Sequence, residues 1–382
     1  MTSQYSYGFI INGMPVESLF FLVFILFISG MLALDLGVFD RHSHEVKFKE
    51  ALVWTTVWVS LAAGFYFLIL YKGEIIHDLN SIGDIQQNIL KYKHPIQLGT
   101  ASFPEALTIY RQNLALEFLT GYLIEYMLSV DNVFVIILIF ISFGVQKMYY
   151  KRVLFWGILG AIVMRFIFIF LSSALIQRFD WVLYVFGIFL AFTGIKMFIE
   201  RNKEGKIETA KHPVIRFASK HLPIYPHYFR GHFWFRNKKD KNKHNFTPLF
   251  LVLLVIEFTD VVFAVDSVPA IFSVTQDPYI VFFSNIFAIL GLRSLFFVVA
   301  HVISMLRFLK HGLSILLTFI GCKMLLHIQL KEWGFTTVHS LIVIVCILSV
   351  SILASLIWPD KRLVNKKKIL KLTGDEPPER II

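Results

Sequence analysis

The feature that most constrains this chain is a series of apolar runs, several of which approach 20 residues in length. An α-helix needs a run of about that length to cross the hydrocarbon core of a bilayer. Lipid offers no water to backbone groups, so only helices or closed barrels span it. Because these runs are too long and too evenly apolar for barrel strands, the sequence predicts an all-α, polytopic membrane helical bundle.

We expect nine transmembrane helices in this bundle. Hydrophobic residues make up 56% of the chain and charged residues 16%, whereas a soluble domain has about 25% charged residues. The two cysteines, Cys322 and Cys346, lie inside apolar runs, so neither a disulfide framework nor a thiolate metal site is expected. The approximate bounds of the predicted helices are 18–38, 51–71, 113–143, 150–176, 181–200, 247–273, 278–305, 313–329 and 338–358.

The distribution of Lys and Arg predicts the orientation of the chain. With the N-terminus outside, inner segments hold 27 of the 37 basic residues, outer segments 6 and the spans 4. The excess of positive charge on one side predicts a cytoplasmic C-terminus. The basic, aromatic loop 201–246 is then cytoplasmic, and we expect it to lie on anionic lipid rather than to bind nucleic acid. The outer segment 73–112 is polar with little helical periodicity, and its sequence suggests no role.

The chain contains an internal repeat. At an offset of 135 residues EYMLSVDNV falls on DVVFAVDSV, and further basic residues follow in the same order. A unit of three helices has odd parity, so the second copy must be inverted in the membrane, as in many secondary transporters whose site lies between the repeats. The corresponding residues are Glu125 and Asp260, Asp131 and Asp266, Asn132 and Ser267, Arg165 and Arg293, and Lys196 and Lys323.

The repeat divides the chain into six segments. They are an N-terminal two-helix unit (1–72), the polar outer segment (73–112), repeat A (113–200), the basic loop (201–246), repeat B (247–329), and a last helix with a basic tail (330–382).

The acids in these repeats call for an explanation, because a carboxylate at the centre of a membrane helix costs about 2.5–3.5 kcal/mol on insertion. On an ideal helix Glu125, Ser129 and Asn132 share one face, while Asp131 lies about 120° away. In the second copy Glu257, Asp260 and Ser267 share a face, and Asp266 again lies off it. We therefore predict that the helices are interrupted near Asp131 and, helped by Pro269, near Asp266.

Such an interruption would bring the acids to one metal site at the midplane. Carboxylate, amide and hydroxyl oxygens are hard ligands that suit Mg²⁺, Ca²⁺ or Mn²⁺. The alternative is that the acids form structural ion pairs with the two arginines of the repeats. The predicted metal ligands are Glu125, Asp131, Asn132, Asp260, Asp266 and Ser267.

Eight further residues are accessory candidates, and six of them have two readings each. Arg165 and Arg293 are counter-ions of the acids or take part in transport. Lys196 and Lys323 neutralise the empty site or extend to the membrane interface. Asp35, near the inner end of the first span, is interfacial or a ligand, and Glu117, near the outer end of its span, is an entry ligand or has no ligand role. The eight accessory candidates are Asp35, Glu117, Ser129, Glu257, Arg165, Arg293, Lys196 and Lys323.

The stretches FLTGYLIEYMLSVDNVFV, DVVFAVDSVPAIF and LDLGVFDRHSHEVKFKEAL resemble the TerC/Alx family of integral membrane proteins, from about Asp35 to about Lys323. The family is named for tellurite resistance, and several bacterial members are understood as manganese exporters. The resemblance implies a fold of two three-helix halves, Mn²⁺ efflux across the bacterial inner membrane, and metal-binding roles for the acidic motif residues. Some members are linked instead to membrane-protein biogenesis or envelope stress.

We therefore predict a secondary transporter, not an enzyme, that exports Mn²⁺, with Ca²⁺ as the second candidate. Protonation of the same carboxylates would couple export to the proton motive force, and the absence of a GxxxxGK[ST] motif argues against ATP hydrolysis. We expect no resident cofactor and no nucleic-acid partner, and the oligomeric state stays open. The alternatives are a membrane scaffold or stress factor with structural acids, and an exporter of a cationic organic solute.

Overall fold

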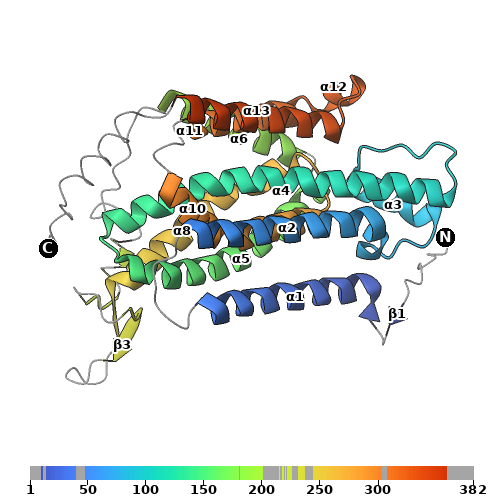
Figure 1. The fold of residues 1–382 in the computed structure, drawn as a ribbon. Coiled ribbons are helices and arrows are strands. Elements are labelled where there is room, and N and C mark those ends of the chain that lie inside the picture. Colours follow the sequence, from blue (N-terminus) through green and yellow to red (C-terminus); the bar gives the residue numbers. More distant parts are fainter. Residues whose placement is uncertain are drawn as a thin grey trace.

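The computed structural model describes residues 10–11, 14–39, 48–179, 181–200, 215, 217–218, 220, 222–225, 231–236, 244–302 and 308–358 (Figure 1). The long helices among them are α1 (Val16–Phe39), α2 (Phe48–Lys72), α4 (Phe103–Ser142), α5 (Lys147–Arg178), α6 (Trp181–Glu200), α8 (Pro248–Phe272), α11 (Leu309–Leu325) and α13 (Thr337–Ile357). The shorter elements are β1 (Ile10–Ile11), β2 (Met14–Pro15), η1 (Gly73–Ile76), α3 (Ile82–Tyr92), β3 (Trp234–Arg236), β4 (His244–Phe246), α9 (Pro278–Leu290), α10 (Leu292–Val302) and α12 (His327–Glu332).

Six of the described helices are long and apolar enough to cross a membrane, and a seventh span results if α9 and α10 are one bent helix. Two shorter apolar helices, Ser18–Ala33 within α1 and His311–Leu325 within α11, accompany them. The chain is thus an all-α, polytopic integral membrane protein. The count of nine spans stays a prediction.

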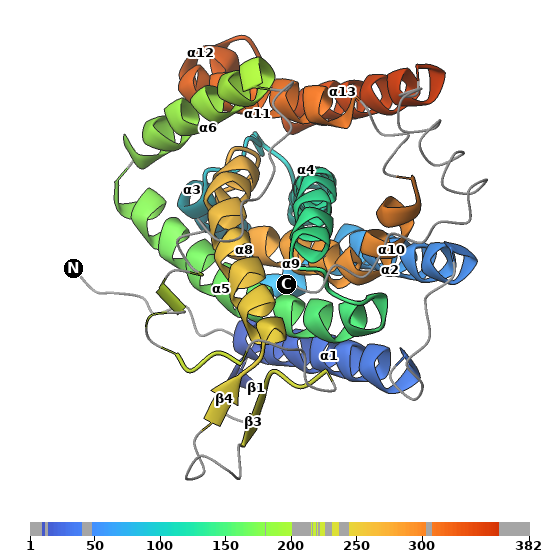
Figure 2. The same cartoon turned by 90° about the vertical axis from the view of Figure 1, so that its left-hand side faces the viewer.

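The helices form a main bundle with a smaller group on one side of it. Figure 2 shows α6, α11 and α13 together, next to the bundle made by α1, α2, α4, α5, α8, α9 and α10. Two ends of the molecule are useful landmarks. The α3 end carries η1, α3 and α12, and the hairpin end carries the antiparallel pair of β3 and β4 (Figure 1).

Glycines bring α6 and α11 close together. A Cβ on Gly321 would lie 2.7 Å from the carbonyl oxygen of Gly187, and one on Gly194 would lie 2.6 Å from the backbone nitrogen of Thr318. Small residues of this kind let backbones approach in a membrane, where no hydrophobic effect drives helices together. The pairing joins the third predicted helix of repeat A to the third of repeat B.

The remaining contacts follow a pattern of exchange between the two predicted repeats. α4 packs against α9, and α5 packs against α8, while α4 also contacts α8 and α5 contacts α9. α4 and α8 are antiparallel, because the loop that follows α8 meets the first half of α4, where Thr275 Oγ1 donates to Glu117 Oε2 at 2.6 Å. Exchanging α4 with α8 and α5 with α9 maps the contact of α4 with α9 onto that of α5 with α8 and leaves the other two contacts unchanged.

The predicted interruptions of the acidic helices are wrong. α4 is helical without a break through Asp131, and α8 is helical through Asp266. Pro269 lies inside α8, three residues before the helix ends at Phe272, and removes one i→i−4 hydrogen bond without breaking the helix. A bend of 45° occurs instead between α9 and α10, at Gly291.

The outer segment 73–112 is more ordered than its sequence suggested. It contains η1, α3 and the first ten residues of α4, which begins at Phe103 rather than near residue 113. A capping box fixes this start, because the Glu105 carboxylate accepts from the backbone N–H of Ser102 at 2.9 Å. Ser81 caps α3 with its side chain, whose hydroxyl accepts from the backbone N–H of Asp84 at 3.1 Å. The basic loop 201–246 lies largely outside the described residues.

Candidate functional site

The buried guanidinium of Arg165, on α5, stands at the centre of a polar cluster in the main bundle. The Arg165 side chain is 1% exposed and forms an ion pair with the Glu125 carboxylate of α4. Its Nη2 lies 3.4 Å from Asp260 Oδ1 of α8. We call Glu125, Arg165, Asp260, Ser267 and Asn285 the Arg165 cluster. Its two acids come from the corresponding positions of the two predicted repeats.

Neutral groups complete this cluster. Arg165 Nη1 donates to Asn285 Oδ1 at 3.2 Å and reaches Ser267 Oγ at 3.5 Å. Asn285 Nδ2 in turn donates to Glu125 Oε2 at 3.2 Å. Asn285, in α9, was missed by the sequence interpretation. The signal that could have found it is an amide inside the apolar run PYIVFFSNIFAIL.

The second acids of the two motifs lie near one another. Asp131 and Asp266 are both half-buried, and their carboxylates are close enough to repel one another. Neither helix is interrupted at these residues. Of the six predicted ligands, Glu125, Asp260 and Ser267 contact Arg165, and Asn132 lines a cavity with Asp260.

A small cavity adjoins these groups. It has a volume of about 20 Å³ and is lined by Asn132 and Asp260, with Thr259 and apolar side chains of α4, α5, α8 and α10 around them. That volume is enough for a single water-sized occupant. The cavity lies on the side of Asp260 toward the hairpin end, since it is also lined by Leu154 and Ile256 from the first halves of α5 and α8.

Three oxygens in this region are buried and lack a hydrogen-bond partner within the described part of the chain. They are Ser129 Oγ, Asp260 Oδ2 and Asp266 Oδ1. A buried polar atom without a partner costs free energy, so such atoms call for an occupant or a role. All three are acceptors of the hard kind that divalent cations prefer.

Among the accessory candidates, two lie beside the Arg165 cluster. Ser129 is fully buried on the same face of α4 as Glu125. Glu257 is half-buried on α8, one turn before Asp260, and the charge of Asp260 acts on it. The Glu257 carboxylate packs against Gly160 of α5, in the space that a larger side chain would fill.

The other candidates lie elsewhere. Arg293 is buried directly after the bend at Gly291, and Lys196 is exposed on α6. The side chain of Asp35, near the end of α1, is outside the described residues. Across the residues that the structure does describe, no three His, Cys, Asp or Glu side chains converge as a metal-binding group. The acids are instead arranged around the guanidinium.

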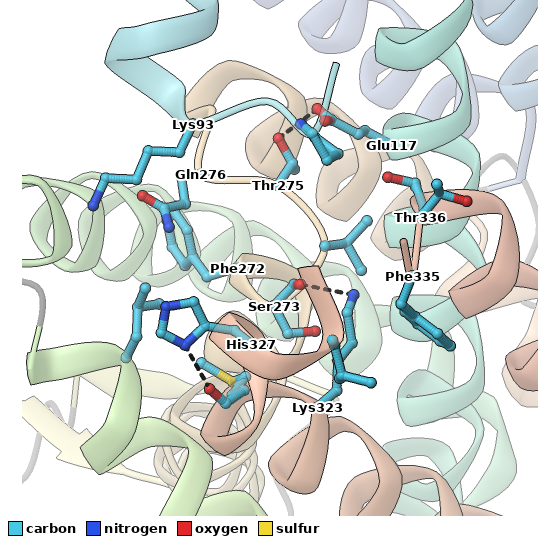
Figure 3. A pocket seen from close by; sticks show the side chains of 16 residues that line it. Lys93, Glu117, Phe272, Ser273, Thr275, Gln276, Lys323, His327, Phe335 and Thr336 are labelled. Carbon is cyan, nitrogen blue, oxygen red and sulfur yellow. Dashed lines mark hydrogen bonds between the residues drawn. The ribbon is translucent and has the colours of Figure 1, made fainter. Parts of the chain in front are cut away.

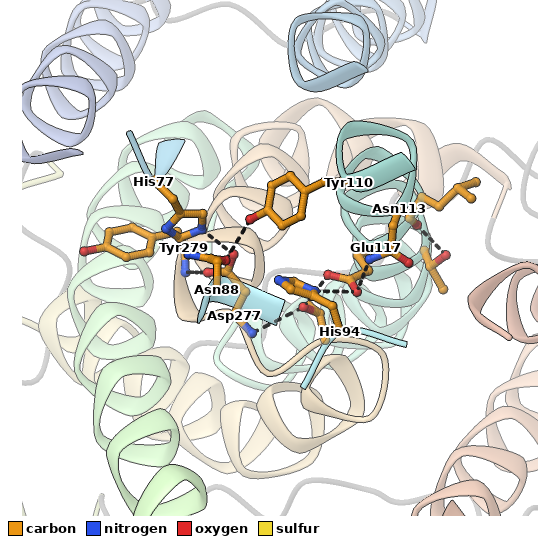
Figure 4. Close-up of polar contacts among 11 residues, drawn as sticks. His77, Asn88, His94, Tyr110, Asn113, Glu117, Asp277 and Tyr279 are labelled. Carbon is orange, nitrogen blue, oxygen red and sulfur yellow. Dashed lines mark hydrogen bonds and ion pairs between the residues drawn. The ribbon is translucent and has the colours of Figure 1, made fainter. Parts of the chain in front are cut away.

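Glu117 belongs to a separate cluster at the α3 end. Its Oε1 accepts from Asn113 Nδ2 at 2.7 Å and lies 2.9 Å from His94 Nδ1, in the connection between α3 and α4 (Figure 4). A second pair lies beside it, in which His77 Nε2 is 2.7 Å from Asp277 Oδ2. Sequence reasoning missed both histidines, because their acidic partners lie far away along the chain.

The charges of this cluster perturb one another. Burial lowers the pKa of His94, but the carboxylates of Glu117 and Asp277 outweigh it, so the pKa is raised from 6.5. Burial likewise raises the pKa of Asp277, but His77, His94 and the backbone N–H of Tyr279 outweigh it, so the pKa is lowered from 3.8. The raised pKa of His94 favours a charged imidazole, and the lowered pKa of Asp277 favours an ionised carboxylate.

Glu117 also lines a pocket of about 180 Å³ at the α3 end. Figure 3 shows Lys93, Gln276, Lys323 and His327 around it, with Thr336 at the start of α13. Lys323 Nζ donates to the carbonyl oxygen of Ser273 at 2.8 Å, and its charge attracts Glu117. This lysine is therefore engaged at the α3 end rather than in the Arg165 cluster.

Comparison with known proteins identifies relatives that align with most of the chain. The family model described as "Integral membrane protein TerC family" matches residues 110–363. The membrane protein STKORF319 of Myxococcus xanthus is 43% identical over 334 residues, which cover 87% of this chain and 91% of that protein. Alx of Escherichia coli K12, whose name proposes it as a membrane-bound redox modulator, is 42% identical over 310 residues, 79% of this chain and 84% of that protein. A membrane protein of Rickettsia felis is 35% identical over 336 residues, 88% of this chain and 97% of that protein. No solved structure matches the chain.

Proposed function

Since this chain belongs to the integral membrane protein TerC family, we propose that it is a secondary transporter that exports divalent metal cations, with Mn²⁺ as its main substrate. The observation that carries the proposal is the Arg165 cluster, where carboxylates from both repeats surround a buried cation, the guanidinium. Ionisable groups inside a membrane protein are rare, and they mark ion pathways, proton relays or counter-ions.

The proposed setting is the bacterial inner membrane, with nine spans and the N-terminus outside. The basic residues of loop 201–246 and of the C-terminal tail then place the hairpin end in the cytoplasm. The exchange pattern of helix contacts supports two inverted three-helix repeats, because a two-fold relation between repeats requires it. In this orientation the small cavity beside Asp260 faces the cytoplasm, from which an exported ion arrives.

In this proposal the metal ion and the guanidinium are alternatives. Two unit charges 4 Å apart repel by about 4 kcal/mol near a protein surface, and a divalent ion repels a guanidinium about twice as strongly. A cation that enters from the cavity would therefore displace Arg165 from Glu125 and Asp260. The orphaned oxygens of Ser129, Asp260 and Asp266 would then serve as its ligands.

Arg165 also prevents the site from holding the metal too tightly. The four acids Glu125, Asp131, Asp260 and Asp266 carry four negative charges when ionised, and a divalent ion bound to them would leave slowly. A guanidinium that returns to the carboxylates competes with the ion and promotes its release. We propose that the proton motive force supplies the energy for the full cycle.

A structural role for the acids is the second candidate, and one observation favours it. Arg165 already pairs with both Glu125 and Asp260, as a clamp between α4, α5 and α8 would. A membrane scaffold or stress factor could use such a clamp without moving any ion. In that case the acids would matter for the amount of folded protein and for nothing else.

Export can be tested in bacterial cells that lack their own Mn²⁺ exporters, challenged with Mn²⁺ and assayed for total cellular manganese. We expect the wild-type protein to lower cellular manganese and Asp131→Ala and Asp266→Ala to lose this effect at equal membrane abundance. Glu332→Ala, an exposed acid on α12, is the matched control and should behave as wild type. If the two aspartate variants still lower cellular manganese, the site is wrong; if they are only depleted from the membrane, the structural role holds.

A further inference from the structure

We propose that the buried pair of His94 and Glu117 at the α3 end is the binding site of the coupling proton, separate from the metal site. The inference rests on the proposed export and deepens it, because it says where the counter-transported proton binds. The extracytoplasmic side, on which this pair lies, is where a proton would enter during export.

The imidazole of His94 contacts the carboxylate of Glu117, and a second carboxylate, that of Asp277, acts on it electrostatically. Its Nδ1 is 2.9 Å from Glu117 Oε1, while its Nε2 is buried without a hydrogen-bond partner among the described residues. The charge of Asp277 acts on the same ring. A neutral ring that donates its Nδ1–H to Glu117 can accept a proton at Nε2, which gives an imidazolium paired with Glu117; the same proton leaves in the reverse step.

Protonation at this place would be felt by both repeats. Glu117 sits on α4 of repeat A and accepts from Thr275 Oγ1, in the connection after α8 of repeat B, at 2.6 Å. Asp277, in the same connection, caps α9 by accepting from the backbone N–H of Tyr279 at 2.9 Å. A change of charge on His94 therefore alters the attraction between the ends of α4 and α8, the two helices that carry the metal ligands.

The surroundings of the pair allow it to exchange protons with the outside. Glu117 forms part of the wall of the 180 Å³ pocket, so a proton can reach the pair from that side. The titratable groups that face the pair or line this pocket beside it are Tyr92 on α3, Tyr110 on α4, Asp277 with its partner His77, Lys323 on α11, and Lys93 and His327.

The pair is distinct in space from the metal site. Glu117 and Glu125 are eight residues apart on one unbroken helix, which corresponds to about 12 Å along its axis. A proton and a metal ion can therefore be bound at different places, and coupling between them passes through movement of α4 against α8 rather than through competition for one carboxylate.

The test uses the full-length protein in liposomes and two measurements of radioactive Mn²⁺. Exchange of labelled for unlabelled Mn²⁺ at equal pH needs the metal site alone, whereas accumulation of Mn²⁺ driven by a pH gradient also needs the proton site. The variants are His94→Gln and Glu117→Gln. The matched control is His327→Gln, which removes an imidazole of the same pocket whose Nδ1 contacts the carbonyl oxygen of Met324.

We expect both variants to keep wild-type exchange and to lose gradient-driven accumulation by about tenfold or more, within the usual range of coupling free energies. The control should keep both activities. Accumulation that survives in His94→Gln and Glu117→Gln overturns the inference, and so does a parallel loss of exchange, which would make the pair a structural clamp. Absence of exchange in the wild-type protein rejects export itself, and the proton site with it.

Discussion

Replacement of Arg165 by Met gives the sharpest prediction about the Arg165 cluster. The substitution keeps a side chain of similar length but leaves Glu125 and Asp260 without their buried cation. Removal of one partner from a buried ion pair costs about 3–5 kcal/mol, because the remaining charge is desolvated and uncompensated. We therefore expect Arg165→Met to unfold at a clearly lower temperature than wild type in the absence of divalent ions.

Mn²⁺ should reverse most of this loss if metal and guanidinium occupy the same place. A ligand present at 100 times its dissociation constant stabilises the folded state by about 2.7 kcal/mol. In wild type part of that gain is spent on displacing Arg165, so the rise in unfolding temperature with Mn²⁺ should be larger in Arg165→Met. Arg178→Met, which removes an exposed arginine from the end of the same helix, is the control.

The assay is thermal unfolding of the purified protein in detergent, with and without Mn²⁺, at a pH of about 8 so that ordinary carboxylates are ionised. An equal or smaller effect of Mn²⁺ on Arg165→Met than on wild type would refute the idea that the metal replaces the guanidinium. A variant as stable as wild type without metal would refute the ion pair itself.

Three further predictions concern other parts of the molecule. Gly321→Leu should destabilise the contact between α6 and α11 by about 1–3 kcal/mol, whereas Gly64→Leu, where the structure leaves open space, should not; thermal unfolding compares them. Because the pKa of His94 is raised above 6.5, its pair with Glu117 stabilises the fold fully below pH 6.5, and this stabilisation is lost as the pH rises through the raised pKa. The difference in stability between wild type and His94→Gln should therefore become smaller as the pH increases. Asn285→Ala removes an amide that is hydrogen-bonded to both Arg165 and Glu125. We expect it to lower the stability by about 1–2 kcal/mol, measured by thermal unfolding, and to reduce Mn²⁺ export, measured as cellular manganese. Wild-type stability together with wild-type export would contradict the role assigned to Asn285.

The membrane helices and the correspondence of the two acidic motifs could be predicted because each depends on short sequence patterns. Apolar length decides whether a helix can span, and the offset of 135 residues aligned Glu125 with Asp260 before any contact was known. Burial of Glu125, Ser129 and Asn132 on one face of α4 follows from the helical period alone.

The arrangement of the acids could not be predicted in the same way. The expected breaks near Asp131 and Asp266 assumed that the acids of each helix had to meet at one point. A third helix can instead link them: Arg165 of α5 joins Glu125 of α4 to Asp260 of α8 while both acidic helices stay unbroken. This link depends on tertiary contacts that a helical wheel does not contain.

The cluster at the α3 end was missed for a related reason. His94 lies in a short polar connection with no recognisable motif, and its partner Glu117 is 23 residues further along the chain. Asp277 and His77 are separated by 200 residues. Only the meeting of α4 with the connection after α8 brings these groups together, so no local pattern signals them.

The central claim is that the chain moves Mn²⁺ through the carboxylates around Arg165. Its most direct test is the initial rate of Mn²⁺ movement into liposomes that contain the purified protein and a Mn²⁺-sensitive dye, compared with Glu125→Gln and with protein-free liposomes. The account predicts movement well above the protein-free rate for wild type and none above it for a correctly folded Glu125→Gln. A wild-type rate no higher than that of empty liposomes, or an undiminished rate in Glu125→Gln, would contradict it.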